Sequence, residues 1–313
     1  MKIAIVGCGA MGSVYAGLLA DGGHEVWAVD PWAEHVAAIN ESGLRVQGAS
    51  GDRTVALAGA VAAPDEIGES MDLVIVATKV GQVTEAAESI ASLLGEDTPV
   101  LSIQNGLGGP QRTAAVVGDD RVVVGVVGGF GASMLGPGHA HHNGMELVRL
   151  GEYSGAGVTA RTETLADVWR SGGFTVNTYD NVHQLVWEKL MCNVAFSGPC
   201  TVTELRVGEL LDDPDASAIS ATCATEAYAV ARAKGIPVDF DDPVAYTRAF
   251  GAKIPDARPS MLLDFLAGRR SEIDAINGAI PNAAAEEGLT APANVVVSAL
   301  VRTKERYRQP PAQ

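Results

Sequence analysis

A glycine-rich turn close to the amino terminus constrains the fold of this chain more than any other feature. Residues 3–6 form an unbroken apolar run, which is typical of a strand buried on both faces. The pattern G-x-G-x-x-G follows at once as Gly7, Gly9 and Gly12, and residues 13–20 have the pattern of an amphipathic helix. A strand, this turn and a helix in that order predict a dinucleotide-binding unit of the Rossmann type.

Each glycine of the motif has its own expected task. Gly7 allows the tight turn, Gly9 lets a pyrophosphate approach the backbone, and Gly12 lets the helix pack against the strand. Unpaired N–H groups and the helix dipole favour an anion at the start of this helix. The expected cofactor-binding residues of the turn are therefore Gly7, Cys8, Gly9, Ala10, Met11 and Gly12.

Asp30 is the acidic residue that the dinucleotide motif requires at the end of the second predicted strand. Its carboxylate is expected to accept hydrogen bonds from both ribose hydroxyls and to repel a 2′-phosphate. Residues 31–35 read Pro-Trp-Ala-Glu-His and hold no lysine or arginine that could neutralise such a phosphate. The sequence therefore favours NADH, with NADPH as the alternative cofactor.

The remaining pattern divides the chain into two parts. Further buried strands are expected at residues 25–30, 73–78, 100–103 and 122–127, with a helix at 83–94, which predicts an α/β domain with a parallel sheet. Helices alone are expected afterwards, at residues 182–196, 216–234, 243–250, 261–266, 271–287 and 293–308. We therefore expect a Rossmann domain over residues 1–180 and an all-α domain over residues 181–313.

Composition and charge exclude several classes of protein. Hydrophobic residues make up 47% of the 313 residues and charged residues 19%, which is typical of a globular chain. The formal net charge of −16 disfavours a nucleic-acid partner. We expect no signal peptide and no membrane span, and hence a cytoplasmic protein.

The cysteines and histidines do not predict a metal site. Cys8, Cys192, Cys200 and Cys223 are scattered and are expected to be reduced, buried thiols. The histidine-rich segment at residues 136–144 alternates as one face of a strand does, and no acid or cysteine completes a ligand set. We therefore expect no bound metal.

A polar stripe crosses the first helix of the second part. Lys189, Asn193 and Ser197 are spaced four apart, which places them on one face of a largely apolar helix. The lysine could extend to solvent, or it could lie in a cleft where partial burial lowers its pKa and allows it to deliver a proton. Glu272, taken on its own, is better explained as a surface acid.

Short motifs in a fixed order carry a family resemblance over nearly the full length. Besides the glycine turn they are Thr78-Lys79, Gln104-Asn105-Gly106, Glu188-Lys189-Leu190 with Asn193, Pro259-Ser260-Met261 with Asp264, and Glu272-Ile273-Asp274 with Asn277-Gly278. In these motifs the chain resembles the ketopantoate reductase, or 2-dehydropantoate 2-reductase, family.

The resemblance implies a fold and a reaction. Members join a Rossmann domain to a helical domain, with the active site in the cleft between them. They reduce a 2-keto acid with a nicotinamide cofactor, here most naturally 2-dehydropantoate to pantoate. The resemblance also suggests a homodimer formed through the helical domain.

The resemblance also implies roles for individual residues. Lys189 matches the catalytic lysine that protonates the forming alkoxide, and Glu272 would help hold that lysine and contact substrate and cofactor. Lys79 and Asn105 match cofactor-contacting cleft residues of the Rossmann domain. The expected substrate-binding residues are Asn105, Asn193, Ser197 and Ser260.

One departure from the family pattern leaves the substrate open. Where relatives often carry an asparagine followed by proline, this chain has Ser197 and Gly198. The substrate could be another branched or hydroxylated 2-keto acid, or the enzyme could run in the oxidative direction. Two further alternatives are a related dehydrogenase of the opine or glycerol-phosphate type and a non-catalytic regulator that senses the dinucleotide.

Overall fold

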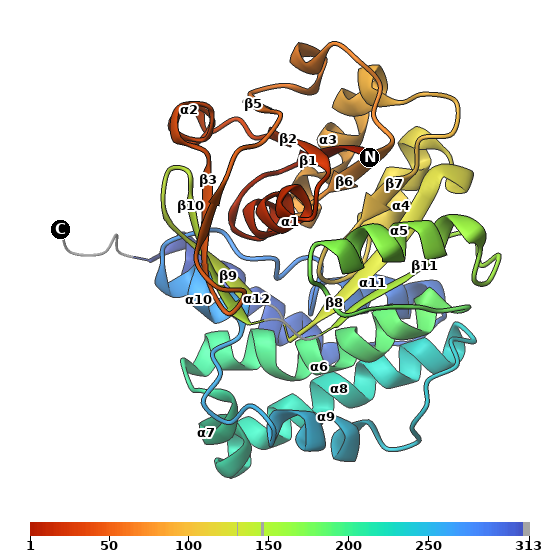
Figure 1. Ribbon diagram of the computed structural model, residues 1–313. Helices are drawn as coiled ribbons and strands as arrows, with labels where there is room; N and C mark the ends of the chain where they lie inside the picture. Colours follow the sequence, from red (N-terminus) through yellow and green to blue (C-terminus); the bar gives the residue numbers. More distant parts are fainter. Residues whose placement is uncertain (130, 145–146, 309–313) are drawn as a thin grey trace. The chain divides into compact units, whose positions relative to one another are not determined.

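The computed structural model describes residues 1–129, 131–144 and 147–308 (Figure 1). The chain forms two compact units. The first contains Met1–Gln104 and Gly108–Val182, and the second contains Asn105–Leu107 and His183–Gln313. Residues 309–313 of the predicted helical domain lie outside the described residues.

An eight-stranded sheet forms the centre of the first unit, in the order β12-β11-β8-β7-β6-β1-β2-β5. Its strands are β1 (Lys2–Val6), β2 (Glu25–Val29), β5 (Gly59–Val61), β6 (Leu73–Val76), β7 (Val100–Ser102), β8 (Val122–Gly128), β11 (Leu147–Glu152) and β12 (Val176–Thr178). All neighbouring strands are parallel except β8 and β11, which are antiparallel. The predicted α/β fold class is thus confirmed.

Strand β1 lies at the point where the strand order reverses, with β2 on one side and β6 on the other. Ile3 is paired with Val26 of β2 and with Leu73 of β6. In open α/β sheets, ligands bind beyond the carboxyl ends of the strands at such a switch point. The glycine turn at residues 7–12 begins at this end of β1.

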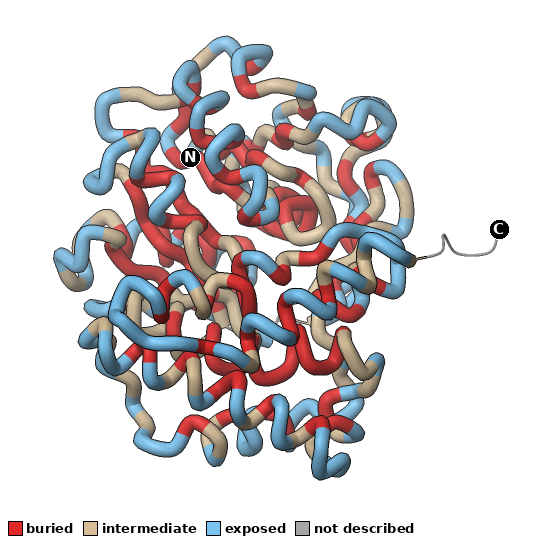
Figure 2. The backbone as a smooth tube through the Cα atoms, turned by 180° about the vertical axis from the view of Figure 1, so that it is seen from behind, coloured by how far each residue is buried: buried red, intermediate tan, exposed pale blue. Residues whose placement is uncertain are grey.

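Helices cover both faces of the sheet (Figure 1). They are α1 (Ala10–Asp21), α2 (Ala33–Ser42), α3 (Val83–Ser89), α4 (Gly109–Val117) and α5 (Ala160–Ser171), with short 3₁₀ turns η1 (Pro64–Ile67), η2 (Val80–Gln82), η3 (Ile90–Leu93) and η4 (Asp119–Arg121). Ile3 packs into the cluster that holds Val14 of α1 and Trp169 of α5, whereas its neighbour Ala4 packs with Val83 of α3. Burial on both faces explains why the strand is apolar throughout, and Figure 2 shows these strands as buried.

A second sheet of four strands, in the order β4-β3-β10-β9, packs on α1. Its strands are β3 (Leu44–Gly48), β4 (Arg53–Val55), β9 (Gly131–Gly136) and β10 (His139–Gly144). The histidine-rich segment was expected to be a strand face, and β10 confirms this. Residues 12–19 of α1 are all buried, because the helix is enclosed by a sheet on each side.

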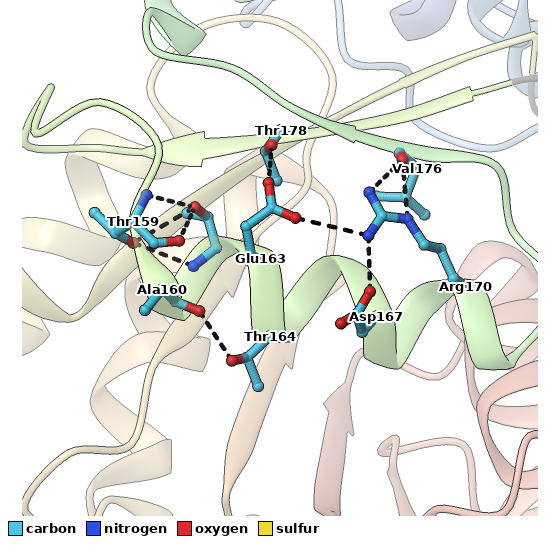
Figure 3. Close-up of polar contacts among 9 residues, drawn as sticks. Thr159, Ala160, Glu163, Thr164, Asp167, Arg170, Val176 and Thr178 are labelled. Atoms are coloured by element: carbon cyan, nitrogen blue, oxygen red, sulfur yellow. Dashed lines mark hydrogen bonds and ion pairs between the residues drawn. The ribbon is translucent and has the colours of Figure 1, made fainter.

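Helix α5 is held by polar contacts at its start and along one side (Figure 3). The Thr159 side chain caps its first turn. Glu163 accepts a hydrogen bond from Thr178 of β12, and Arg170 donates from Nη2 to the Val176 carbonyl over 3.0 Å. These contacts fix the helix to the edge strand of the sheet.

The second unit is helical. Its helices are α6 (Val182–Thr203), α7 (Val207–Asp212), α8 (Pro214–Ala233), α9 (Pro243–Gly251), α10 (Ser260–Leu266), α11 (Ala279–Glu286) and α12 (Pro292–Arg306). Two predictions were wrong at their boundaries. Helix α6 continues past the expected end at Phe196, and residues 271–278 form turns rather than the start of a helix. Among the described residues, no helix is both long and apolar enough to cross a membrane.

Asn277 explains how α6 continues across Gly198 and Pro199. Proline removes one helical N–H donor, and glycine weakens the helix. The Asn277 side chain donates to the Val194 carbonyl over 2.9 Å and accepts the Gly198 N–H over 3.2 Å. The buried Asn277 side chain therefore links the Val194 carbonyl and the Gly198 N–H, which lie one helical turn apart in α6.

Candidate active site

Two glycines of the amino-terminal turn are required by the protein's own packing. Gly7 has a φ of +90°, and a Cβ there would lie 2.6 Å from the backbone nitrogen of Thr78. A Cβ on Gly12 would lie 2.2 Å from the carbonyl oxygen of Gly7. The Gly7 N–H donates to the Val29 carbonyl over 2.9 Å, which ties the turn to the end of β2. The turn is therefore fixed on β1, β2 and β6.

Gly9 differs, because nothing inside the protein requires it to be glycine. Its φ is −69°, and no atom lies within 4 Å of the place where a Cβ would stand. Gly9 is the N-cap of α1, which has no side-chain cap and no acidic residue in its first turn. Open space before uncapped N–H groups fits a pyrophosphate, so the residues present are suited to a dinucleotide.

Asp30 follows β2 directly and is half-buried. Its Oδ1 accepts the Trp32 N–H over 3.0 Å, and its own N–H donates to the Val61 carbonyl over 3.1 Å. These bonds hold the carboxylate at the carboxyl end of β2, where the ribose of a dinucleotide lies in a Rossmann fold. Lys79 stands exposed at the start of η2, just after β6.

Lys189 and Asn105 are brought together. Nζ of Lys189 donates to Oδ1 of Asn105 over 2.6 Å, although the two residues are 84 positions apart. Lys189 is half-buried on α6, with the fully buried Leu190 and Val194 on the same helix. The structure thus places the lysine in a polar contact rather than extended into solvent.

Asn105 belongs to the second unit, whereas the resemblance implied the Rossmann domain. The next two residues explain this difference. The Leu107 N–H donates to the Ala275 carbonyl over 2.8 Å. Gly106 has a φ of +81°, and a Cβ there would lie 2.3 Å from the same carbonyl oxygen. Glycine is therefore required beside Asn105 so that the 271–278 turns can approach it.

The other expected substrate residues differ in exposure. Asn193 is half-buried and Ser197 is 4% exposed, both on the same stripe of α6 as Lys189. Glu272 is half-buried, and its carbonyl accepts the N–H of Ala275 over 3.0 Å. Ser260 is exposed at the first position of α10.

Sequence reasoning assigned no task to Asn277 or to His35, although both are fully buried polar residues with side-chain hydrogen bonds. The family motif that contains Asn277 and Gly278 was the available signal for Asn277, whereas its place beside the Gly198-Pro199 pair is visible only in the structure. From the sequence, His35 is only one of the residues 31–35, none of which is a lysine or arginine that could neutralise a phosphate. No local pattern indicates its partners.

His139 and His142 of β10 make hydrogen bonds within the second sheet and its turns, and the four cysteines are buried. His139 Nε2 lies 3.0 Å from Gln47 Oε1, and His142 Nδ1 lies 3.0 Å from Ser50 Oγ. In the described part of the chain, no three His, Cys, Asp or Glu side chains are grouped to hold a metal. All four cysteines are free and buried, and burial raises the pKa of each thiol to about 12.

Comparison with known proteins agrees with this geometry. The family model described as "Ketopantoate reductase PanE/ApbA" matches residues 3–155, and its C-terminal counterpart matches residues 181–305. The chain belongs to the ketopantoate reductase family. It is therefore an NAD(P)-dependent oxidoreductase of the 2-dehydropantoate 2-reductase type, acting on a CH–OH group.

Individual relatives extend over the whole chain. A 2-dehydropantoate 2-reductase of Halobacterium salinarum is 29% identical over 306 residues, which cover 98% of this chain and 99% of that protein. The crystal structure of a PanE/ApbA family ketopantoate reductase from Ralstonia eutropha JMP134 has a TM-score of 0.89 and 33% identity, covering 98% and 99% of the two chains. A D-mandelate dehydrogenase with NADH and anilino(oxo)acetate has a TM-score of 0.88 and 30% identity, covering 98% of each chain.

Proposed function

We propose that this ketopantoate reductase family member reduces 2-dehydropantoate to pantoate, with Lys189 as the proton donor and NADH as the favoured cofactor. The observation that carries the proposal is the 2.6 Å hydrogen bond from Lys189 Nζ to Asn105 Oδ1. It orients an ammonium group on a helix face that also presents Asn193 and Ser197.

The chemistry follows from the groups at this position. When bound, NADH would supply the hydride for the keto carbon, so negative charge would build on the carbonyl oxygen. A positioned ammonium stabilises that charge and delivers the proton that completes the hydroxyl. The Asn105 amide oxygen accepts an N–H of Lys189 without taking its proton, so it orients the acid and leaves it charged. The neutral amine is then reprotonated from water.

The substrate carboxylate requires donors close to it, because a chain with a net charge of −16 does not attract an anion. We propose Lys79, Asn193 and Ser260 as these donors, with the amide nitrogen of Asn105. Glu272 is proposed to hold Lys189 and to contact the cofactor. Residues 7–12 are proposed to hold the pyrophosphate and Asp30 the ribose hydroxyls.

The likeness to a D-mandelate dehydrogenase supports a second candidate, the interconversion of a bulkier 2-hydroxy acid and its keto acid. Ser197 and Gly198, where the chain departs from the pattern that the family resemblance implies, leave this alternative open. The two candidates share the cofactor and the lysine and differ only in the substrate.

A substrate panel tests the proposal. Oxidation of NADH and of NADPH is followed by absorbance with 2-dehydropantoate, with aliphatic 2-keto acids and with phenylglyoxylate, and NAD⁺ reduction is followed with D-mandelate. The highest kcat/KM with 2-dehydropantoate supports the proposal, and the highest with phenylglyoxylate supports the second candidate. Dinucleotide binding without turnover of any acid contradicts both and supports a regulator.

We also propose that two copies associate through the helical unit in the cytoplasm. A groove of about 440 Å³ lies among α6, α8 and α12 and is lined almost wholly by apolar side chains. Ile219, Val296 and Leu300 beside it are 41%, 57% and 45% exposed. Apolar area of this kind on a soluble enzyme is typical of an interface. The four free, buried cysteines suit a reducing compartment.

Light scattering after size exclusion checks the proposed dimer. The wild type is expected at twice the chain mass, and Val296→Lys with Leu300→Lys is expected at the chain mass, because two buried ammonium groups oppose association. Val116→Lys in the first unit, where the valine is 39% exposed, is the control. A wild type that is monomeric at the concentrations of the assay rules the dimer out.

A further inference from the structure

His35 is a fully buried histidine on α2 for which the proposed chemistry has no use. Its two ring nitrogens face two different elements of the first unit. Nδ1 accepts the N–H of Gly138, in the turn between β9 and β10, over 2.9 Å. Nε2 lies 3.3 Å from Oγ of Ser13 on α1. Ser13 is also fully buried, and its Oγ donates to the Cys8 carbonyl over 2.9 Å.

These contacts determine which atom donates and which accepts in each hydrogen bond. A backbone N–H can only donate, so Nδ1 of His35 is unprotonated and the proton of the neutral ring is on Nε2. Nε2–H then donates to Ser13, and the Ser13 hydroxyl donates onward to Cys8. Burial lowers the pKa of His35, although Asp30 and a hydrogen bond from the ring to the Cys8 backbone oppose that shift, and the lowered pKa agrees with a neutral ring. Trp32 stacks on the ring, with centroids 5.2 Å apart and planes 14° apart.

The carbonyl at the end of this chain lies in the middle of the glycine turn. The peptide bond is planar and trans, so the Cys8 C=O and the Gly9 N–H point in opposite directions. A Cys8 carbonyl held towards Ser13 therefore sets the direction of the Gly9 N–H. No protein atom lies within 4 Å of the place where a Cβ of Gly9 would stand.

The histidine matters because Ser13 has another hydrogen-bond acceptor available. A serine inside a helix commonly donates to the carbonyl four residues earlier, which here is that of Gly9. Donation from His35 Nε2–H occupies a lone pair of Ser13 and turns its hydroxyl hydrogen towards Cys8 instead. Without that donation the Cys8–Gly9 peptide loses its fixed orientation.

We infer that His35 is a positioning residue for the dinucleotide: through Ser13 and the Cys8 carbonyl, it keeps the Gly9 N–H aimed at the pyrophosphate. This inference rests on the proposed dinucleotide site at residues 7–12. Because Gly138 donates to His35, the inference also means that the turn between β9 and β10 contributes to cofactor affinity.

Two substitutions of His35 separate the roles of its two ring nitrogens. His35→Gln places an amide N–H near the place of Nε2 and retains the donor to Ser13. His35→Asn places an amide oxygen near the place of Nδ1 and retains only the acceptor for Gly138. The dissociation constant for NADH, measured by fluorescence titration, is expected to rise roughly five- to tenfold in His35→Asn and in Ser13→Ala, as for loss of one buried hydrogen bond. It should stay within about twofold of the wild type in His35→Gln, which keeps that bond.

His142→Asn is the matched control for general loss of stability. His142 is also fully buried in the first unit, and its Nδ1 contacts the hydroxyl of Ser50, which does not lead to the glycine turn. A lower Tm with unchanged NADH affinity is expected for this control. If His35→Asn and His35→Gln bind NADH equally well, or if affinity follows Tm across all three histidine variants, His35 is only structural and the inference is overturned. A wild type that binds neither NADH nor NADPH overturns the proposed site itself, and this inference with it.

Discussion

Lys189 is the residue on which the proposed reaction depends most. Replacement by alanine removes both the charge that stabilises the alkoxide and the proton that completes the hydroxyl. We expect Lys189→Ala to lower kcat by roughly 10²-fold or more, the range for a positioned general acid. Steady-state rates at saturating keto acid and NADH measure this.

Lys253→Ala, at an exposed position of the same unit, should leave kcat unchanged. A loss in Lys189→Ala that is confined to KM would show that the lysine binds substrate without donating the proton.

Asp30 is expected to decide between the two dinucleotides. Its carboxylate repels a 2′-phosphate, and residues 31–35 contain no cation to offset this. Asp30→Ala should therefore raise the ratio of kcat/KM for NADPH to that for NADH by roughly tenfold, as for loss of about 1.4 kcal/mol of discrimination. Asp30→Asn separates charge from hydrogen bonding, because it keeps an oxygen for the Trp32 N–H. An unchanged ratio in both variants would mean that Asp30 does not contact the ribose.

At the residue scale, the sequence predicted the features that short local motifs determine, and it missed the hydrogen bonds between residues far apart in the chain. The glycine turn and Asp30 follow from a short motif with a known geometry. The partner of Lys189 lies 84 positions away and that of His35 lies 103 positions away. The resemblance named Lys189 and Asn105 as site residues but did not pair them, and His35 had no signal, because single-sequence patterns do not specify which distant residues meet.

Helix α6 shows how tertiary contacts override local propensity at the element scale. Gly198 and Pro199 predict the end of a helix, yet α6 runs to Thr203. The Asn277 side chain bridges the Val194 carbonyl and the Gly198 N–H, the two helix groups directly before Pro199 in the bonding pattern. Asn277 also donates to Asn294 of α12 over 2.9 Å. The continuity of α6 therefore depends on segments about 80 residues further along the chain.

Gly198→Ala tests this dependence. A Cβ at position 198 would stand 2.5 Å from both Asn277 Oδ1 and Val297 Cγ1, so the bridge or the packing of α12 has to shift. Although alanine has the higher helix propensity, we expect the free energy of unfolding to fall by roughly 1–3 kcal/mol, as for overpacking in a core. Urea titration measures it. Gly136→Ala is the control, because no atom lies within 4 Å of its Cβ position.

If Gly198→Ala proved as stable as the wild type, the glycine would have no packing role and the Asn277 bridge would tolerate displacement. Helix propensity alone would raise the free energy of unfolding of Gly198→Ala by about 1 kcal/mol. A rise therefore indicates that propensity dominates, and a fall indicates that the close packing around Gly198 dominates.

The second sheet was the largest part of the fold that the sequence did not predict. Strand β9 reads Gly-Ala-Ser-Met-Leu-Gly and β4 has only three residues, Arg53–Val55. Short strands with glycine and no apolar run carry little periodic signal. They are ordered by packing on α1, which is itself buried on almost every side. Of these four strands, β10 was the one predicted, from its alternating histidines.

At the scale of the whole molecule, the charge balance affects both stability and binding. A net charge of −16 repels anionic substrates and becomes less negative as histidines gain protons. Exposed pairs such as Arg45 with Asp52 contribute little to stability. The pH dependence near neutrality therefore falls mainly on His24, His35 and His142, whose pKa values are lowered by burial.

The sign of that dependence follows from linkage. A histidine whose pKa is lower in the folded state than its ordinary value near 6.5 takes up its proton more readily when unfolded. Its contribution to stability is complete above about pH 6.5 and is lost as the pH falls towards the folded-state pKa, by up to about 1.4 kcal/mol per pH unit for each histidine. We therefore expect the urea midpoint to decrease between about pH 7.5 and 5.5 at constant ionic strength, before the carboxylates titrate.

His142→Gln isolates one of these histidine contributions. The glutamine does not titrate, so the variant should be less stable than the wild type at pH 7.5 and yet lose less stability on acidification to pH 5.5. The Nδ1 contact with Ser50 concerns β10 and not the glycine turn, so NADH affinity at pH 7.5 should be unchanged. Parallel stability curves for variant and wild type would place the acid sensitivity elsewhere. His35→Gln, measured in the same way, then shows whether the histidine beside the dinucleotide turn carries the remainder.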